Sequence, residues 1–255
     1  MRDPNCTMAG AAVRSRQQRH KKQQNSKQIV LIVLAALVFL TGAALLIYPA
    51  FSQWYNARGQ SDVIADYGEQ VDGLDDEAVE REIRRARQYN RDLTDTVAQS
   101  DPFKTEGTVD TTEYDTLLQA TQEGVMAYIE IPAIDVYLPI YHGVGKDVLE
   151  KGVGHLPETS LPVGGESTHC VLAGHSGMSN ARLFTDLPKL KQGDVFYIHV
   201  YNRTLTYTVD QIKTVVPTDT SALNIVSGQD YVTLVTCTPY GVNSHRLLVR
   251  GTRTE

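Results

Sequence analysis

The sequence predicts a mostly β protein, in which a closed β-barrel of about eight strands follows N-terminal helices and one transmembrane helix. Three observations support this prediction. From residue 124 onward, short β-rich runs alternate with turn signals. Residues 51–123 are polar and favour helices instead. Residues 29–50 form an apolar stretch without a charge. The chain is therefore expected to divide into an anchor, a helical region and a barrel.

The predicted strands are short and closely spaced. They read VMAYIEIP, VYLPIYHG, HCVLAGH, DVFYIHV, RTLTYTVDQIKTVVP, DYVTLVTC and RLLVRG. Tyr201, Asn202 and Arg203 separate two alternating runs, which is typical of a hairpin connection. Many short strands with little helix between them favour a closed or nearly closed barrel, which we expect at residues 124–255.

The apolar stretch IVLIVLAALVFLTGAALLIYPA, residues 29–50, is long enough to cross a bilayer core of about 30 Å. The alternative is a cleaved signal peptide, but the apolar core of such a peptide is usually only about 7–15 residues long. Seven basic residues and one acidic residue lie in residues 1–28. The positive-inside rule therefore predicts a basic cytoplasmic tail at 1–28, a single membrane pass, and residues 51–255 outside the cell.

The formal net charge of −6 is unevenly distributed. Residues 29–255 contain 17 basic and 29 acidic residues, a net charge of −12. Nucleic-acid binding needs a basic face, so no nucleic-acid partner is expected. The basic tail beside the membrane stretch is interpreted as a topology signal.

The region 51–123 is predicted to be helical with one loop. The run DDEAVEREIRRARQYNRDL places Val79, Ile83, Ala86 and Tyr89 near one helical face, with acidic residues early and arginines late, as a helix dipole prefers. The run SDPFKTEGTVD is expected to be a loop because proline and glycine break a helix. The run EYDTLLQAT is expected to be a second short helical segment.

Cys237 is the candidate nucleophile. It ends the apolar run YVTLVTC, and Pro239 and Gly241 then require a loop, so the thiol is expected at the end of a strand, where it is both held and accessible. If the next strand, HRLLVRG, pairs antiparallel across TPYGVNS, Arg246 lies on the adjacent strand beside Cys237. A guanidinium there could favour a thiolate, the reactive form of cysteine, or stabilise an oxyanion.

His175 is the candidate general acid and base. It follows the apolar run CVLAG and therefore also lies at a strand end. His245 neighbours Arg246 and should point to the opposite face of its strand. A histidine and a cysteine at two strand ends form a plausible nucleophile pair, but spacing alone leaves open an inert thiol and a turn histidine.

These motifs resemble those of a known family. The string VTLVTCTPYGVNSHRLLVRG is similar to the sortase signature TLxTC and the arginine strand that follows it, and especially to that of the class C, pilus-assembling sortases. LAGHSG resembles the histidine segment of the same family, and ARQYNRDL followed by SDPF resembles the N-terminal region of that class. The resemblance runs from about residue 80 to 252 in the correct order, and it implies a sortase-type barrel.

The resemblance also implies roles for the candidate residues. Cys237 would cleave an LPXTG-type sorting signal between threonine and glycine and form a thioester, while His175 would transfer protons and Arg246 would stabilise the oxyanion. The acceptor would be a lysine amine on another pilin, so the partners would be pilin subunits and the product a pilus. The protein would lie in the cell membrane of a Gram-positive bacterium.

A lid over the active site is implied by the same resemblance. Asp101 would face Arg246, and Phe103 would cover Cys237, in a loop at about residues 100–107. Class C sortases usually carry a second, C-terminal transmembrane helix, whereas this sequence ends at GTRTE.

Neither a cofactor nor a metal is expected. The histidines are scattered and the three cysteines are far apart, which does not fit a metal-ligand cluster. Cys170 lies five residues before His175, so on a regular strand it points to the opposite face, and we interpret it as a small core residue.

Three other functions fit the sequence in part. A housekeeping sortase would use the same chemistry to attach proteins to a cell-wall precursor. A cysteine endopeptidase would use water as the acceptor. A membrane-tethered β-barrel adhesion module would have an inert thiol at position 237.

Overall fold

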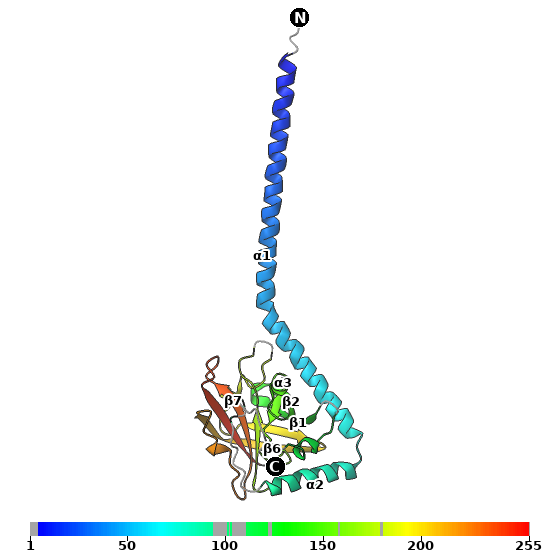
Figure 1. Cartoon of the computed structure of the whole chain (residues 1–255), viewed down its shortest axis with the longest axis vertical. Coiled ribbons are helices and arrows are strands. Elements are labelled where there is room, and N and C mark those ends of the chain that lie inside the picture. The colour runs from blue at the N-terminus through cyan, green and yellow to red at the C-terminus, as the bar shows by residue number, and fades with distance from the viewer. Residues whose placement is uncertain are drawn as a thin grey trace. The chain divides into compact units, whose positions relative to one another are not determined.

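The computed structural model describes residues 5–93, 101, 103, 111–121, 124–157, 159–178 and 181–254, and for residues 5–30 it describes the backbone alone. The chain divides into two compact units, Met1–Phe51 and Ser52–Glu255. The first unit and the start of the second share the long helix α1 (Asn5–Asp72) (Figure 1). From Leu31 onward this helix contains a stretch of mean hydropathy 2.7, none of it buried, which is long and apolar enough to cross a membrane.

The end of α1 and helix α2 are the two α-helical segments that precede the barrel in the described part of the second unit. The last part of α1 packs through buried Ile64, Tyr67 and Val71, and the Tyr67 hydroxyl accepts a hydrogen bond of 2.7 Å from the backbone N–H of Tyr201. Helix α2 (Asp76–Asp92) begins where the Asp75 carboxylate accepts a hydrogen bond from the first turn.

The buried face of α2 confirms the predicted amphipathic helix. Its buried positions are Val79, Ile83, Ala86 and Asn90, and Tyr89 packs partly buried beside them. The Asn90 side chain exchanges two hydrogen bonds with the backbone of Leu161, one in each direction. This contact anchors the helix to the loop before the fourth strand.

The predicted second helical segment is much shorter in the structure. Only a 3-10 turn, η1 (Tyr114–Thr116), forms, and Leu118 follows with a positive φ of 55° that ends any helix. Leu117 and Leu118 are both buried, and the Tyr114 hydroxyl accepts a hydrogen bond from the Gly143 backbone N–H. Burial of these three side chains against the barrel outweighs the local helical preference.

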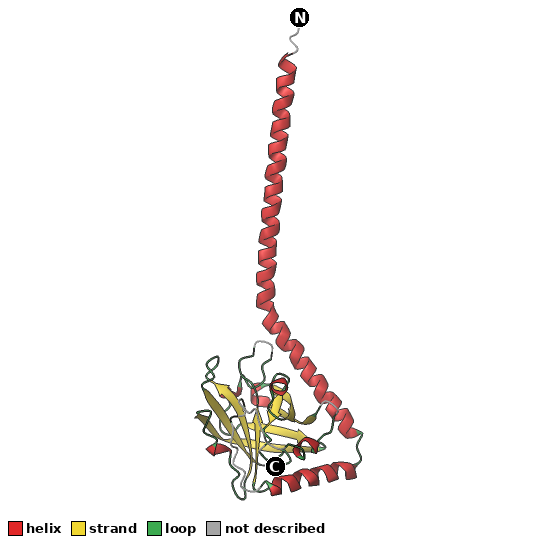
Figure 2. Ribbon diagram, viewed as in Figure 1, coloured by secondary structure: helices red, strands yellow, loops and turns green. Residues whose placement is uncertain are grey.

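The predicted barrel is confirmed: eight strands of the described residues close in the order β1-β2-β3-β4-β7-β8-β6-β5 (Figure 2). Their bounds are β1 (Val125–Ile131), β2 (Val136–His142), β3 (Val153–His155), β4 (Thr168–Ala173), β5 (Val195–Val200), β6 (Arg203–Val215), β7 (Asp230–Thr238) and β8 (His245–Arg253). The short helical connections are η2 (Pro132–Ile134), α3 (Lys146–Leu149), η3 (Leu187–Lys189) and η4 (Ser221–Leu223). The predicted hairpin at Tyr201 and Asn202 joins β5 to β6.

Two apolar clusters lie on opposite faces of β7. Val232 and Leu234 belong to the large core that fills the barrel and extends to α2. Val235 points the other way, because side chains alternate along a strand, and it joins a smaller cluster outside the barrel. That cluster contains Leu156, Val171, Leu223, Val235 and Leu248, with Phe103 packed against it. The outer face of β4, β7 and β8 is therefore a covered surface.

Candidate active site

The register of three adjacent strands places the candidate residues in one row. Strands β4 and β7 are parallel, and each residue of β4 pairs with the residue 62 positions later, as Ala173 does with Val235. The same offset extended past the end of β4 matches His175 with Cys237. Two side-chain hydrogen bonds hold this extension, from Thr236 Oγ1 to the Gly174 carbonyl and from Ser176 Oγ to the Cys237 carbonyl, both 2.7 Å long.

Arg246 lies on the other side of Cys237. The antiparallel pairing of β7 and β8 across the loop TPYGVNS, expected from the sequence, is confirmed, and it sets Cys237 opposite Arg246. Val235 pairs with Leu248 two residues away, so Cys237 and Arg246 share the outer face of the barrel with the small apolar cluster. The thiol thus lies between an imidazole and a guanidinium, at the same end of three neighbouring strands.

Asp101 binds Arg246 through both carboxylate oxygens. Arg246 Nε donates to Asp101 Oδ1 at 2.8 Å, and Arg246 Nη2 donates to Asp101 Oδ2 at 2.6 Å. Both side chains are only 7% exposed, so the pair is buried. Arg246 Nη1 also donates to the carbonyls of Asn243 and His245 at 3.1 and 3.0 Å. The guanidinium therefore donates two hydrogen bonds to Asp101 and two to the carbonyls of Asn243 and His245.

Phe103 packs against the same row. Its ring centroid is 5.6 Å from that of His175, and the Arg246 guanidinium carbon lies 5.1 Å from it, within range of a cation–π contact. The Phe103 backbone N–H donates to Asp101 Oδ1 at 3.3 Å, which links the two residues. The rest of the predicted lid loop at about 100–107 lies outside the described residues.

The surroundings of the thiol and of the imidazole both disfavour the charged form of the group. Burial raises the pKa of Cys237, an effect that the nearby Asp101 charge increases and the Arg246 charge opposes. Burial lowers the pKa of His175, against an opposing effect of Glu150. Burial also acts to lower the pKa of Arg246, but the hydrogen bonds that Arg246 donates to Asp101 outweigh this effect, and the pKa is raised. The guanidinium is therefore permanently charged.

Two glycines shape the loop that carries His175. A Cβ atom added to Gly174 would lie 2.7 Å from the Phe184 ring, so only glycine fits beside that ring. Gly177 has a φ of +80°, which favours glycine, and a Cβ atom there would approach the exposed Tyr240 ring to 3.1 Å. The segment that carries His175 can therefore pack closely against Phe184 on one side and against the loop after Cys237 on the other.

Three residues that sequence reasoning missed support the site. Ser176 and Thr236 hold the backbones of β4 and β7 together beside the thiol. Glu150 acts electrostatically on His175 from the loop after α3. The position of Ser176 directly after His175 could have indicated its role, but Glu150 acts on His175 from a distant part of the sequence, and no local pattern indicates that.

The predicted core position of Cys170 is confirmed. It is 3% exposed and belongs to the large apolar cluster, and burial raises its pKa well above the usual value. Cys170 and Cys237 are both free thiols. No group of three or more potential metal ligands occurs among the described residues. Of the described thiols, Cys237 alone is partly accessible.

The structure is a closed β-barrel whose outer face carries a partly exposed thiol between a histidine and an arginine. A profile of the sortase domain matches residues 129–254. The structure of sortase C-1 from Actinomyces oris is 48% identical, with a TM-score of 0.66, over 69% of this chain and 99% of that one. The chain belongs to the sortase family.

Other relatives agree with this assignment. Sortase C from Streptococcus pneumoniae is 45% identical, with a TM-score of 0.70, over 76% of this chain and 97% of that one. Sortase A from Streptococcus agalactiae is 32% identical over 117 residues, which are 45% of this chain and 47% of that protein. The match thus spans about half the length of this curated relative. The structural neighbours are class C sortases, as the sequence motifs indicate.

Proposed function

We propose that this protein is a class C sortase that cleaves an LPXTG-like sorting signal between threonine and glycine and joins the threonine to a lysine amine of a pilin. The row of His175, Cys237 and Arg246 on neighbouring strands carries this proposal. A nucleophile, a proton-transferring group and a cation are the three parts that covalent acyl transfer needs, and strands hold them rigidly.

The first half of the reaction forms a thioester. Cys237 loses its proton and attacks the carbonyl carbon of the threonine, and the charge on the carbonyl oxygen is stabilised by Arg246. His175 gives a proton to the nitrogen of the leaving glycine as the peptide bond breaks. Because burial disfavours the charged form of both groups, proton transfer from the thiol to the imidazole is the step that produces the reactive thiolate in this proposal.

The second half transfers the acyl group. An amine attacks the thioester carbonyl, the carbon–sulfur bond breaks, and His175 accepts a proton from the attacking nitrogen. The pilin acceptor is proposed because the chain is 45% identical to a sortase C whose structural description concerns pilin substrate specificity. The product would be an isopeptide-linked pilus.

Asp101 and Phe103 act as a lid in this proposal. Asp101 occupies the Nε and Nη2 donors of Arg246, which the substrate oxyanion needs, and Phe103, which contacts the His175 ring, would cover Cys237. A substrate can use Arg246 only after this ion pair opens, so lid movement is a gating step that precedes chemistry.

The proposed location is the membrane of a Gram-positive cell, with the catalytic domain outside. The apolar part of α1 is long enough to span a bilayer, and the basic residues before it predict a cytoplasmic N-terminus. The proposed domains are a tail at 1–28, a span at 29–50, a helical region at 51–123 and the barrel at 124–255.

The experiment uses the full chain in detergent micelles with an LPXTG peptide and a lysine-bearing pilin domain. Mass spectrometry should detect a peptide–lysine conjugate with the unaltered protein and none with Cys237→Ala. Peptide cleavage without any conjugate would indicate an endopeptidase. A silent protein that gains activity on Asp101→Ala would indicate a closed lid, whereas silence in both, with an unreactive thiol, would refute the proposal.

A further inference from the structure

The backbone hydrogen bonds that pair β4 with β7 end just before His175. In a parallel pair, the backbone N–H of every second residue of one strand donates to a carbonyl of the other. The last such bond here runs from the Gly174 N–H to the Val235 carbonyl, at 3.0 Å. By the same spacing, the next bond would run from the Ser176 N–H to the Cys237 carbonyl, each two residues further along its strand.

The Ser176 hydroxyl makes this bond in place of the backbone N–H. Ser176 Oγ donates to the Cys237 carbonyl at 2.7 Å, and both residues are partly buried. A hydroxyl reaches further from the backbone than an N–H does, so the chain can leave the strand direction here and still stay bonded to β7. Gly177 follows with a φ of +80°, a left-handed conformation that no regular strand contains.

His175 therefore lies between two points of attachment to β7. Before it, Thr236 Oγ1 donates to the Gly174 carbonyl at 2.7 Å, and after it, Ser176 Oγ donates to the Cys237 carbonyl. Of these two bonds, only that of Ser176 ends on the nucleophile residue itself. The Ser176 bond therefore bears directly on the separation between the imidazole and the thiol.

We infer that Ser176 is a positioning residue, whose hydroxyl holds the His175 imidazole in place beside the Cys237 thiol during both halves of the proposed reaction. The inference rests on the proposed acyl transfer and adds the group that sets the geometry of its proton transfers. The proton passes from the thiol to the imidazole and then to the leaving nitrogen, and a displaced imidazole slows both steps. Ser176 neither gives nor takes a proton, because its O–H stays bonded to the Cys237 carbonyl.

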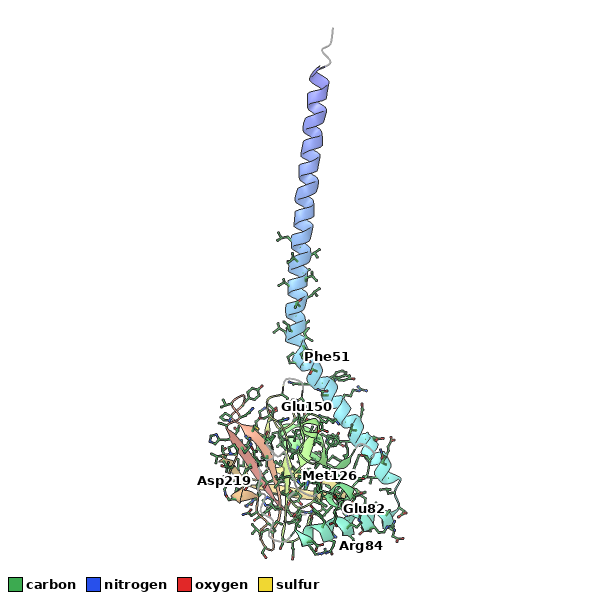
Figure 3. All side chains as sticks on the ribbon, in the orientation of Figure 1. Phe51, Glu82, Arg84, Met126, Glu150 and Asp219 are labelled. Carbon is green, nitrogen blue, oxygen red and sulfur yellow. The ribbon has the colours of Figure 1, made fainter. Side chains whose placement is uncertain are left out.

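The Ser176 hydroxyl acts through position and not through charge. Burial and the charge of Glu150, which is labelled in Figure 3, act on the pKa of His175. Burial and two neighbouring charges act on the pKa of Cys237. Ser176 carries no charge, so its removal should leave both pKa values in place while it slows the proton transfers.

Three substitutions separate the Ser176–Cys237 bond from the general attachment of this segment. Ser176→Ala removes the hydroxyl, and Ser176→Thr retains one. Thr185→Ala is the matched control, because Thr185 Oγ1 accepts a hydrogen bond of 3.1 Å from the Gly177 backbone N–H. The control thus removes a bond of the same kind from the same segment, but one that does not reach Cys237.

The experiment uses the full chain with Asp101→Ala in every variant, so that opening of the lid does not limit the rate. Each variant is mixed with excess LPXTG peptide without an amine, and intact mass gives the rate constant of thioester formation. Ser176→Ala should lower this rate constant about three- to tenfold at saturating peptide, the scale of one neutral hydrogen bond. The peptide concentration that gives half the maximal rate should change by less than about twofold, because Ser176 bonds the protein and not the peptide.

Acetyl-lysine amide (free side-chain amine) then tests the second half of the reaction. It should release the acyl group from Cys237 more slowly in Ser176→Ala, by a similar factor. Ser176→Thr should recover most of both rate constants, and Thr185→Ala should match the unsubstituted background. The pH profile of thioester formation should keep its midpoints in Ser176→Ala while its plateau falls, and urea unfolding should show similar free energies for Ser176→Ala and Thr185→Ala.

Several results would overturn the inference. These are rate constants that Ser176→Ala leaves unchanged, equal losses in Ser176→Ala and Thr185→Ala, and a loss that Ser176→Thr shares in full. A shifted pH midpoint at an unchanged plateau would also overturn it, because the hydroxyl would then act on protonation and not on position. If the Asp101→Ala background itself shows no Cys237-dependent cleavage of the peptide, the proposed function fails instead, and the two failures are distinguishable.

Discussion

Replacement of Asp101 by alanine should make the Cys237 thiol more reactive. The substitution removes two hydrogen bonds, of 2.8 and 2.6 Å, from the Arg246 guanidinium, and with them the ion pair that holds the lid on the barrel. It also removes a negative charge that raises the pKa of Cys237. Both effects act in the same direction, because a more open site and a lower pKa each increase the amount of accessible thiolate.

The size of the effect follows from the hydrogen bonds. A hydrogen bond to a charged group contributes about 1.5–3 kcal/mol net. If the closed lid is favoured by the equivalent of one such bond, its loss increases the open fraction about ten- to hundredfold. Opening also breaks the contacts of Phe103 with His175 and Arg246. These contacts still favour the closed lid in the variant, so the increase in the open fraction is smaller. We therefore expect an increase of about tenfold in the alkylation rate constant.

The assay is iodoacetamide labelling, followed by mass spectrometry of the peptide that contains Cys237. The variants are made in a Cys6→Ala background, and Cys170 is 3% exposed and should stay unlabelled. The matched control is Asp210→Ala, since Asp210 binds Arg250 with the same two-point geometry at Nε and Nη2. An alkylation rate that Asp101→Ala leaves at the level of the Asp210 control would refute the lid.

Three further predictions concern the arginine, the histidine loop and the buried histidines. Arg246→Lys should raise resting thiol labelling, because lysine cannot replace both bonds to the carboxylate, yet should slow peptide cleavage about 10²–10³-fold, as measured by mass spectrometry. Gly174→Ala should lower the free energy of unfolding in urea by about 1–3 kcal/mol, because its Cβ would lie 2.7 Å from the Phe184 ring. Burial lowers the pKa of His155 and of His169 to about 4, against about 6.5 when unfolded. The unfolded chain then binds more protons, so stability should fall by about 3 kcal/mol per histidine as the pH drops from 6.5 to 4, measured by urea unfolding.

Each of these predictions has a contradicting outcome. Arg246→Lys contradicts the account if labelling and cleavage change in the same direction. Gly174→Ala does so if it is no more destabilising than Gly68→Ala, whose Cβ meets nothing and which should gain helix propensity. A free energy of unfolding that is constant between pH 7 and pH 4.5 would show that His155 and His169 carry no such penalty.

The barrel and α2 could be predicted because their signals are local. Alternation of side chains along each run marks the strands, and a helical period marks Val79, Ile83 and Ala86. Cys237 and Arg246 could be placed together because one short loop joins their strands. Each of these predictions depends only on residues that are close together in the sequence.

The rest of the site depends on contacts between distant segments. His175 meets Cys237 through a parallel pairing with an offset of 62 residues, and parallel pairs carry no turn signal between them. Asp101 meets Arg246 across 145 residues, so only the family resemblance indicated that pair. The run EYDTLLQAT is predicted to be a helical segment from its local pattern, but only a 3-10 turn forms there. Burial of Leu117 and Leu118 overrides the local pattern.

In the proposed reaction, Cys237 carries the acyl group. The most direct measurement is the intact mass of the full chain after incubation with an LPXTG peptide and without any amine acceptor, in the Asp101→Ala variant so that the lid does not limit access. Acyl transfer through Cys237 predicts an added mass equal to the peptide's leucine-to-threonine fragment, bound at Cys237, removed by hydroxylamine and absent when Cys237→Ala is also present. A peptide cleaved with no adduct at Cys237, or an adduct that persists without this cysteine, would contradict it.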